Sequence, residues 1–143
     1  MALDTIQQFE GLKLKAYKDS VGIWTVGFGN IFNLDTGNPI KEGDEISLET
    51  AERWLKIEVD NLQAKMRKVI TVPLNDNQWT ALTSLTYNIG FGAFKRSTLL
   101  RLLNAGASKE EVAKQFLRWN KAGGKEIKGL TNRRQAEYNL YLK

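Results

Sequence analysis

The sequence predicts an α+β domain with two lobes, in which a long helix joins a small N-terminal sheet to a larger helical part and leaves a cleft between them. Three observations predict this fold. The chain has 143 residues, the length of a single domain. Glycine-punctuated β-type sequence is confined to the first third, and strong helical periodicity occupies most of the remainder.

The N-terminal part begins with a predicted short helix over residues 2–10. Leu3, Ile6 and Phe9 share one helical face, and Gly11 is a typical helix stop. From Leu14 to about Pro39, β-branched and aromatic residues alternate with glycines, a texture that indicates short strands and tight turns. We expect the sheet lobe to cover residues 12–46 approximately.

A connecting helix is predicted at about 47–70. Ser47 is a candidate cap and Pro73 lies just beyond the expected end. Apolar residues recur there at intervals of three and four: Leu48, Ala51, Leu55, Val59, Leu62, Met66 and Val69. Glutamates cluster near the start and basic residues near the end, the order that the helix dipole favours.

The remaining residues, about 73–143, form the expected helical lobe, on which helix 2–10 packs. Capping boxes and glycine stops divide this lobe into several helices. The signals are a capping box at 75–78, a helix over 97–106, a second capping box at 108–111, a glycine loop at 123–124 and a last helix over about 131–142.

Composition excludes several kinds of chemistry. The chain has no histidine and no cysteine, which excludes a Ser-His-Asp triad, a thiol nucleophile and the usual zinc site. Carboxylates remain, and glycosidases use carboxylates. Hydrolytic chemistry in this chain would therefore rest chiefly on carboxylates, helped by hydroxyls and cations. No apolar run approaches the roughly 20 residues of a membrane span, and the first residues lack the pattern of a signal peptide.

The net charge of +5 is unevenly distributed. Residues 1–108 hold 12 basic and 12 acidic side chains, whereas residues 109–143 hold 9 and 4. An anionic partner would fit this end of the chain: nucleic acid, an anionic membrane or an acidic wall polymer. The alternative is that the charge serves solubility alone.

Glu10 and Asp19 are candidates for a general acid and a base. Glu10 falls in the last turn of the predicted helix, where the dipole and nearby aromatic residues would raise a carboxyl pKa. Asp19 lies in a polar turn, where a carboxylate would stay hydrated and ionised. Taken singly, each is better explained as an ordinary helix-end or turn residue.

Thr25 is the third candidate. Strand alternation places Trp24, Val26 and Phe28 on the core face and leaves Thr25 beside Gly27 on the other face. There a bulky ligand could approach the backbone, and the hydroxyl could orient a water molecule. A threonine that merely favours a strand is the alternative.

These residues together resemble a known family. Glu10-Gly11, Tyr17-Lys18-Asp19 and the run from Gly22 to Gly29 resemble the E-G…Y-x-D-x-x-G-x-x-T-x-G-x-G pattern of phage-type lysozymes, the muramidase endolysins of tailed bacteriophages. Further similarities extend over essentially the whole chain: Ala81-Leu82, Tyr87 to Gly90, Gly92 to Phe94, Ser97 to Leu100, Trp119, Gly129-Leu130, Arg133-Arg134 and Glu137.

The resemblance implies a glycoside hydrolase that cleaves the β-1,4 bond between N-acetylmuramic acid and N-acetylglucosamine in peptidoglycan, with inversion. Glu10 would protonate the leaving oxygen, and Asp19 with Thr25 would position the attacking water. Arg133 would approach Glu10 from the last helix and lower its pKa, against the effects named above. The same matching implies three residues that line the glycan cleft: Tyr87, Asn88 and Ser97.

One position departs from the family pattern. The family usually has histidine after Gly-x-Gly as a structural partner, and this chain has Asn30. We expect altered stability and retained activity.

Two other functions stay open. A lytic transglycosylase also needs an acid but forms 1,6-anhydro ends without water, and the pairing of Asp19 with Thr25 favours hydrolysis. A small basic protein could instead coat nucleic acid or membranes through residues 109–143, although a buried stripe there favours helices that pack in a core. We expect no nucleic-acid partner, but contact of this basic end with an anionic outer membrane fits the charge.

The family also implies where such a protein acts. We expect a monomer that needs no cofactor and no metal. It would accumulate in the host cytoplasm and reach the periplasm and cell wall once a partner such as a holin opens the membrane.

Overall fold

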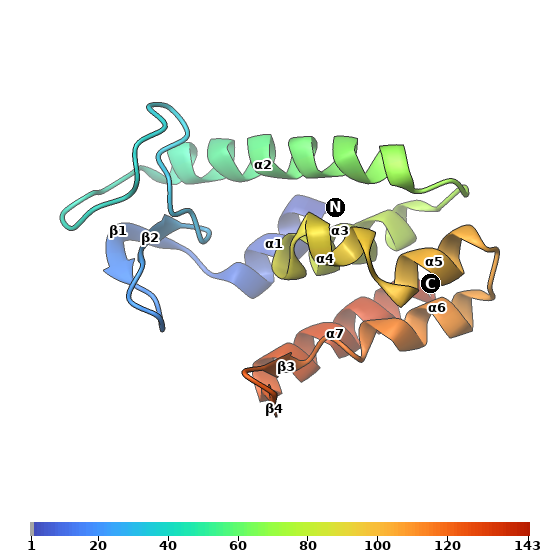
Figure 1. Ribbon diagram of the computed structural model, residues 1–143. Coiled ribbons are helices and arrows are strands. Elements are labelled where there is room, and N and C mark those ends of the chain that lie inside the picture. Colours follow the sequence, from blue (N-terminus) through green and yellow to red (C-terminus); the bar gives the residue numbers. More distant parts are fainter. Residues whose placement is uncertain (1) are drawn as a thin grey trace. The chain divides into compact units, whose positions relative to one another are not determined.

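A computed structural model describes residues 2–143, and the chain forms two compact units. One unit is Ile6–Glu58, and the other combines the residues up to Thr5 with Val59–Lys143. The elements are mostly helices, with two small antiparallel sheets, so the predicted α+β class is confirmed (Figure 1). None of the helices in residues 2–143 is long and apolar enough to cross a membrane.

The unit Ile6–Glu58 contains most of helix α1 (Ala2–Glu10) and the hairpin of β1 (Lys13–Lys18) and β2 (Trp24–Gly27). The strands are antiparallel, and their register shifts between Lys13 and Tyr17. Val26, Ile40 and Trp54 form one buried cluster of this unit, with partly buried residues packed around them. The predicted sheet is therefore a short two-stranded hairpin. Its buried residue Val26 packs with Ile40 from the following loop and with Trp54 from the helix after that loop.

A tight turn follows β2. Val26 and Asn30 exchange both backbone hydrogen bonds, at 2.9 and 2.8 Å. Gly27 and Gly29 have φ values of +70° and +97°, which side chains other than glycine adopt only with strain. The two glycines of the Gly-x-Gly motif are thus needed to reverse the chain directly beside Glu10.

Helix α2 (Leu48–Val69) covers the predicted connecting helix almost residue for residue. Ser47 caps it as expected, because its hydroxyl accepts the backbone N–H of Thr50 at 3.1 Å. The division between the two compact units falls within this helix: its residues up to Glu58 belong to one unit, and its residues from Val59 belong to the other.

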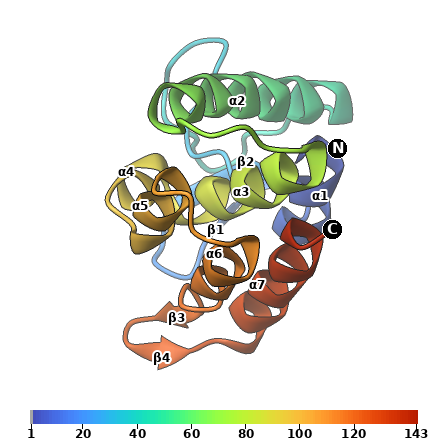
Figure 2. The same cartoon turned by 90° about the vertical axis from the view of Figure 1, so that its right-hand side faces the viewer.

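The second unit is built on α3 (Asp76–Ile89) and α7 (Lys128–Tyr141), which pack against each other, with α6 (Lys109–Phe116) beside α7 (Figure 2). The short helices α4 (Phe91–Lys95) and α5 (Thr98–Asn104) connect α3 to α6. Asn75 and Gln78 form the predicted capping box at the start of α3. Ser108 caps α6 as predicted, because its side chain accepts a hydrogen bond from the backbone N–H of Glu111.

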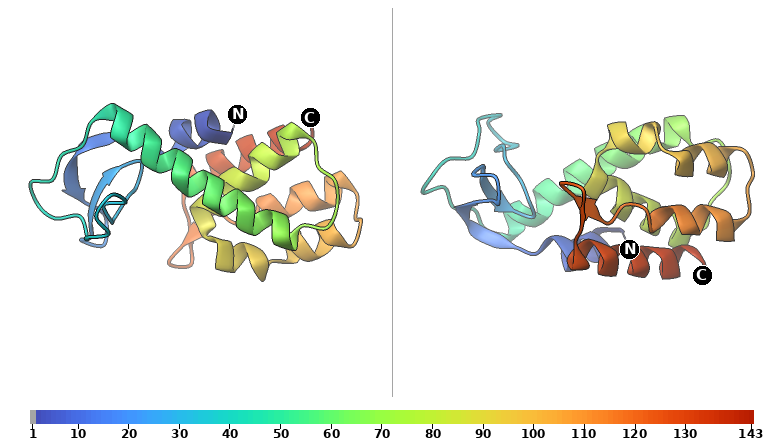
Figure 3. Two further views of the ribbon diagram at one scale, coloured as in Figure 1. Left: turned by 90° about the horizontal axis from the view of Figure 1, so that it is seen from above. Right: turned by 60° about the horizontal axis from the view of Figure 1, so that its bottom comes forward.

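Three local features differ from the sequence-based expectation. The glycines at 123–124 turn a small hairpin of β3 (Lys121–Ala122) and β4 (Lys125–Glu126), which leads into α7 (Figure 3). Helix α7 begins at Lys128, three residues before the predicted start, and α4 was not predicted. Helices and strands this short carry too few residues for a periodic pattern to reveal them.

Candidate active site

Glu10 is the last residue of α1, and Gly11 ends the helix with a φ of +68°. The half-buried Glu10 side chain lies at the turn after β2. Its Oε2 is so near this turn that a Cβ atom built on Gly29 would lie 3.8 Å from it. The predicted helix end and the predicted Gly-x-Gly turn therefore meet at one carboxylate. This is the position from which an acid could deliver a proton to a ligand.

Asp19 is held rigidly in the turn between β1 and β2. Its Oδ1 accepts the backbone N–H groups of Val21 at 2.9 Å and Ile23 at 2.8 Å, and its own N–H donates to the Ile23 carbonyl. Oδ1 is thereby occupied, which leaves Oδ2 to face solvent or ligand. The predicted polar turn is present and orients the carboxylate.

Thr25 is linked to the same backbone. Its hydroxyl donates to the Ile23 carbonyl at 2.9 Å, so Ile23 contacts both Asp19 and Thr25. The expectation of an open face beside Gly27 is wrong: a Cβ there would lie 3.1 Å from Asn30 Oδ1 and 3.3 Å from Ile46 Cδ1. The protein itself fills that space, and Thr25 is only 4% exposed. Asn30, in the turn after β2, and Ile46, from the loop before α2, occupy the face that was expected to be open.

Asn30 contacts a carboxylate that sequence analysis did not single out. Asn30 is 4% exposed, and its Nδ2 donates to Glu58 Oε1 at 2.5 Å. Burial raises the pKa of Glu58, the bond from Asn30 opposes this, and the charge of Glu10 raises it further. Glu10, Asn30 and Glu58 therefore form one electrostatic group. Where the family has histidine, this chain places a neutral amide against Glu58.

The raised pKa of Glu58 predicts a pH-dependent effect of Glu58→Gln on stability. A carboxyl whose pKa is raised by folding stabilises the protein below about pH 4.5, its ordinary value, and loses that contribution as pH rises through the folded pKa. Glutamine stays neutral and still accepts the Asn30 bond. The variant should therefore gain stability relative to the wild type between pH 4 and pH 8 in urea unfolding.

The control is Glu52→Gln, an exposed residue of the same helix. It should show no such trend. If the difference in stability between Glu58→Gln and the wild type stayed constant or fell with rising pH, the pKa of Glu58 would not be raised by folding.

The other predicted site residues lie in the second unit. Tyr87 and Asn88 lie near the end of α3, half-buried and exposed respectively. Ser97 caps α5: its hydroxyl donates to the Phe94 carbonyl at 2.7 Å and accepts the Leu100 N–H at 3.0 Å. Its hydroxyl thus already has a structural role.

Arg133 belongs to a buried charge network on α7. Arg133 Nε lies 3.3 Å from Glu137 Oε2, and Arg134 Nε lies 2.7 Å from Glu137 Oε1. Ser84 of α3 donates to the same carboxylate at 2.5 Å, and its carbonyl accepts from Arg133 at 3.1 Å. Burial raises the pKa of Glu137, although both guanidiniums and the serine bond oppose it. The network fixes Arg133 against α3.

Sequence analysis missed the roles of Glu58 and Glu137, but the sequence contains a signal for each. Glu58 follows Leu55 by three positions and precedes Leu62 by four, which places an acid on the apolar stripe of α2. Glu137 has arginines three and four positions before it. Acidic residues at such positions require a buried partner.

Comparison with known proteins decides the family. The family model described as "Phage lysozyme" matches residues 7–137, which include Glu10, Asp19 and Thr25. The chain belongs to the phage lysozyme family. The expected enzyme class, a glycoside hydrolase of the lysozyme type, is thereby confirmed.

Individual relatives agree with this assignment. The chain is 41% identical to the endolysin of Salmonella phage P22 over 137 residues, covering 96% of this chain and 92% of that protein. It is 39% identical to the endolysin of Bacillus phage B103 over 98% of its own length, but spans only about half (52%) of that relative.

Solved structures match as well. The endolysin from Escherichia coli O157:H7 phage FAHEc1 has a TM-score of 0.89 and 42% identity, with 99% of this chain and 90% of that one covered. The lysozyme-like fold that the sequence predicts is therefore confirmed.

Proposed function

We propose that this phage lysozyme hydrolyses the β-1,4 bond between N-acetylmuramic acid and N-acetylglucosamine in bacterial peptidoglycan, with inversion, and so lyses the host cell. The observation that carries the proposal is a pair of hydrogen bonds at the backbone of Ile23. It binds Asp19 through its N–H and Thr25 through its carbonyl, in the same unit that holds Glu10. An inverting glycosidase needs two carboxyl groups, one as general acid and one as the base that activates water, and here a hydroxyl adds a further acceptor for that water.

The hydrogen bonds support a specific arrangement of the attacking water. The Thr25 hydroxyl uses its proton on the Ile23 carbonyl and offers only lone pairs to a ligand. Asp19 Oδ2 is likewise an acceptor. A water that donates one proton to each directs its own lone pair toward the anomeric carbon. Asp19 takes a proton from that water as it attacks, while Glu10 transfers its proton to the leaving oxygen.

The remaining site residues belong to the same proposal. Tyr87, Asn88 and Ser97 line the glycan-binding surface, and Arg133, held by Glu137, supports Glu10 as its cation. These assignments rest on the family pattern. For Ser97, the cap of α5 means that contact with substrate would involve the remaining lone pair of its hydroxyl.

We also propose that residues 1–143 work as one lysozyme domain, as a monomer without cofactor, and that nucleic acid is not a partner. The enzyme acts on the host cell wall after release from the cytoplasm. Exposed lysines of the β3–β4 hairpin, Lys121 and Lys125, support contact with an anionic outer-membrane surface.

Product mass tests the proposed reaction. Purified peptidoglycan digested to completion should give fragments with reducing ends, each one water heavier than the 1,6-anhydro fragments of a lytic transglycosylase. The digestion buffer without enzyme is the control. Anhydro products would show that water is not the nucleophile and would contradict the roles of Asp19 and Thr25.

A further inference from the structure

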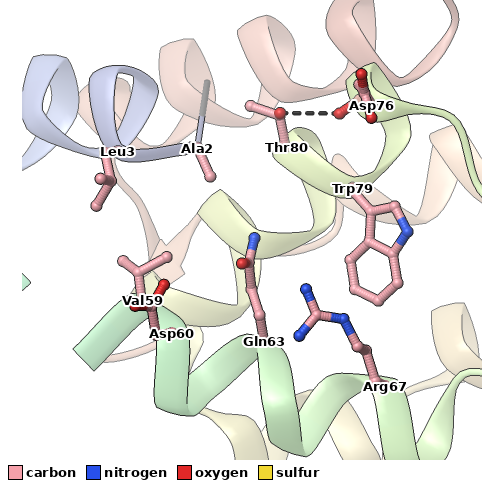
Figure 4. A pocket seen from close by; sticks show the side chains of 9 residues that line it. All are labelled: Ala2, Leu3, Val59, Asp60, Gln63, Arg67, Asp76, Trp79 and Thr80. Carbon is pink, nitrogen blue, oxygen red and sulfur yellow. Dashed lines mark hydrogen bonds between the residues drawn. The ribbon is translucent and has the colours of Figure 1, made fainter. Parts of the chain in front are cut away.

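A pocket of about 440 Å³ lies among α1, α2 and α3, entirely within the second unit. Figure 4 shows its lining side chains: Ala2 and Leu3 come from α1, Gln63 and Arg67 from α2, and Asp76, Trp79 and Thr80 from α3. Val59 and Asp60 complete it. Its volume falls in the range of small-molecule sites. None of these residues belongs to the proposed catalytic group.

Arg67 is the chief donor in this pocket. Its guanidinium carbon lies 5.6 Å from the centroid of the Trp79 ring, and this contact holds an otherwise exposed side chain against the ring. Among residues 2–143, no carboxylate pairs with this guanidinium and no hydrogen bond engages it. An arginine stacked in this way is prepared to bind a carboxylate through two parallel hydrogen bonds.

Acceptors line other parts of the same pocket. Thr80 donates its hydroxyl proton to the backbone carbonyl of Asp76 at 2.8 Å. The carboxylate of Asp76 takes no part in this bond, is exposed, and offers an acceptor at the start of α3. Gln63 donates its amide N–H to Thr83 at 3.2 Å, which leaves its amide oxygen as an acceptor. A ligand in this pocket must therefore satisfy the Arg67 cation together with the acceptors on Asp76 and Gln63.

This charge pattern excludes two simple ligands. A bare anion bound to Arg67 would also be repelled by the Asp76 carboxylate of the same pocket, so its attraction would be largely cancelled. A neutral sugar would need a free aromatic face, but Arg67 covers the Trp79 ring, which also packs against the helical core. What fits is a group that carries both a carboxylate and an ammonium.

We propose that this pocket binds the amino-acid end of a peptide, with its carboxylate on Arg67 and its ammonium on Asp76. The diamino acid in the stem peptides of many peptidoglycans has both groups on one carbon. The choice of this ligand rests on the proposed function. The pocket would then recognise the peptide part of the polymer, whereas the catalytic residues act on its glycan part.

The test is a titration of the ¹⁵N-labelled protein with the tripeptide L-alanyl-γ-D-glutamyl-meso-diaminopimelate, followed by NMR. We expect saturable shifts of the Trp79 indole N–H and the Gln63 amide, with binding about tenfold weaker in Arg67→Ala. Asp76→Asn should weaken binding as well. Arg101→Ala, an exposed arginine of α5, is the matched control and should bind as the wild type does.

Two modified ligands sharpen the result. Amidation of the carboxylate at the free amino-acid end of diaminopimelate, or acetylation of the amine on the same carbon, should abolish the shifts. The inference is overturned if no signal of the pocket moves, if Arg67→Ala binds the peptide unchanged, or if N-acetylglucosamine oligomers move the pocket signals and the peptide does not. The titration needs no turnover. If no binding is seen with an enzyme that still cleaves peptidoglycan, the inference about the pocket is rejected and the proposed hydrolysis is unaffected.

Discussion

Glu10→Gln should lower the rate of peptidoglycan hydrolysis by at least about a hundredfold, because the leaving oxygen then has no positioned proton donor. Glutamine has nearly the same shape and cannot transfer a proton at neutral pH. It also lies at the end of α1, where a neutral side chain avoids the negative end of the helix dipole. The variant should therefore remain folded, and the loss of turbidity of exposed cell walls measures the effect.

The matched control is Glu42→Gln, an exposed loop residue of the same unit, which should keep full activity. Urea unfolding of both variants separates loss of catalysis from loss of structure. A Glu10→Gln protein that is folded and fully active would exclude Glu10 as the acid.

Glu137→Ala should lower the free energy of unfolding by about 3–5 kcal/mol, the range expected when one partner of a buried ion pair is removed. Glu137 is 1% exposed, and Arg133 and Arg134 are 5% and 0% exposed. Alanine would leave two buried guanidiniums without their carboxylate and Ser84 without its acceptor. Urea unfolding at pH 7 measures the loss.

Gln135→Ala is the control on the same helix, because that side chain is exposed and should cost less than about 0.5 kcal/mol. Changing Arg134 and Glu137 together to methionine and leucine should recover part of the stability, since apolar residues of similar volume often replace a buried pair well. A cost below about 1 kcal/mol for Glu137→Ala would show that the network contributes little to the fold.

The sequence allowed prediction of the elements that periodicity and caps define. Helices α1, α2 and α3 lie where apolar spacing, Ser47, Asn75 and Gly11 predict them. The α+β class follows from the same patterns. The hairpin β3–β4 and helix α4 could not be predicted, because their few residues carry no period and the glycines at 123–124 fit a loop equally well.

The candidate site was predictable in its residue types but not in its contacts. Glu10 and Asp19 stand out by their places at a helix end and in a turn. That Glu58 approaches Asn30 depends on how α2 packs on the hairpin, which no local pattern specifies. The open face expected beside Gly27 was wrong for the same reason, since Asn30 and Ile46 reach it from later in the chain.

The anomeric form of the first product tests the central claim most directly. Soluble peptidoglycan glycan strands should be cleaved in an NMR tube while proton spectra record the new reducing ends. A water positioned by Asp19 and Thr25 opposite Glu10 gives the α-anomer first, with the β-anomer growing later by mutarotation. If the β-anomer appears first, the reaction retains configuration, and the roles assigned to Asp19 and Thr25 are contradicted.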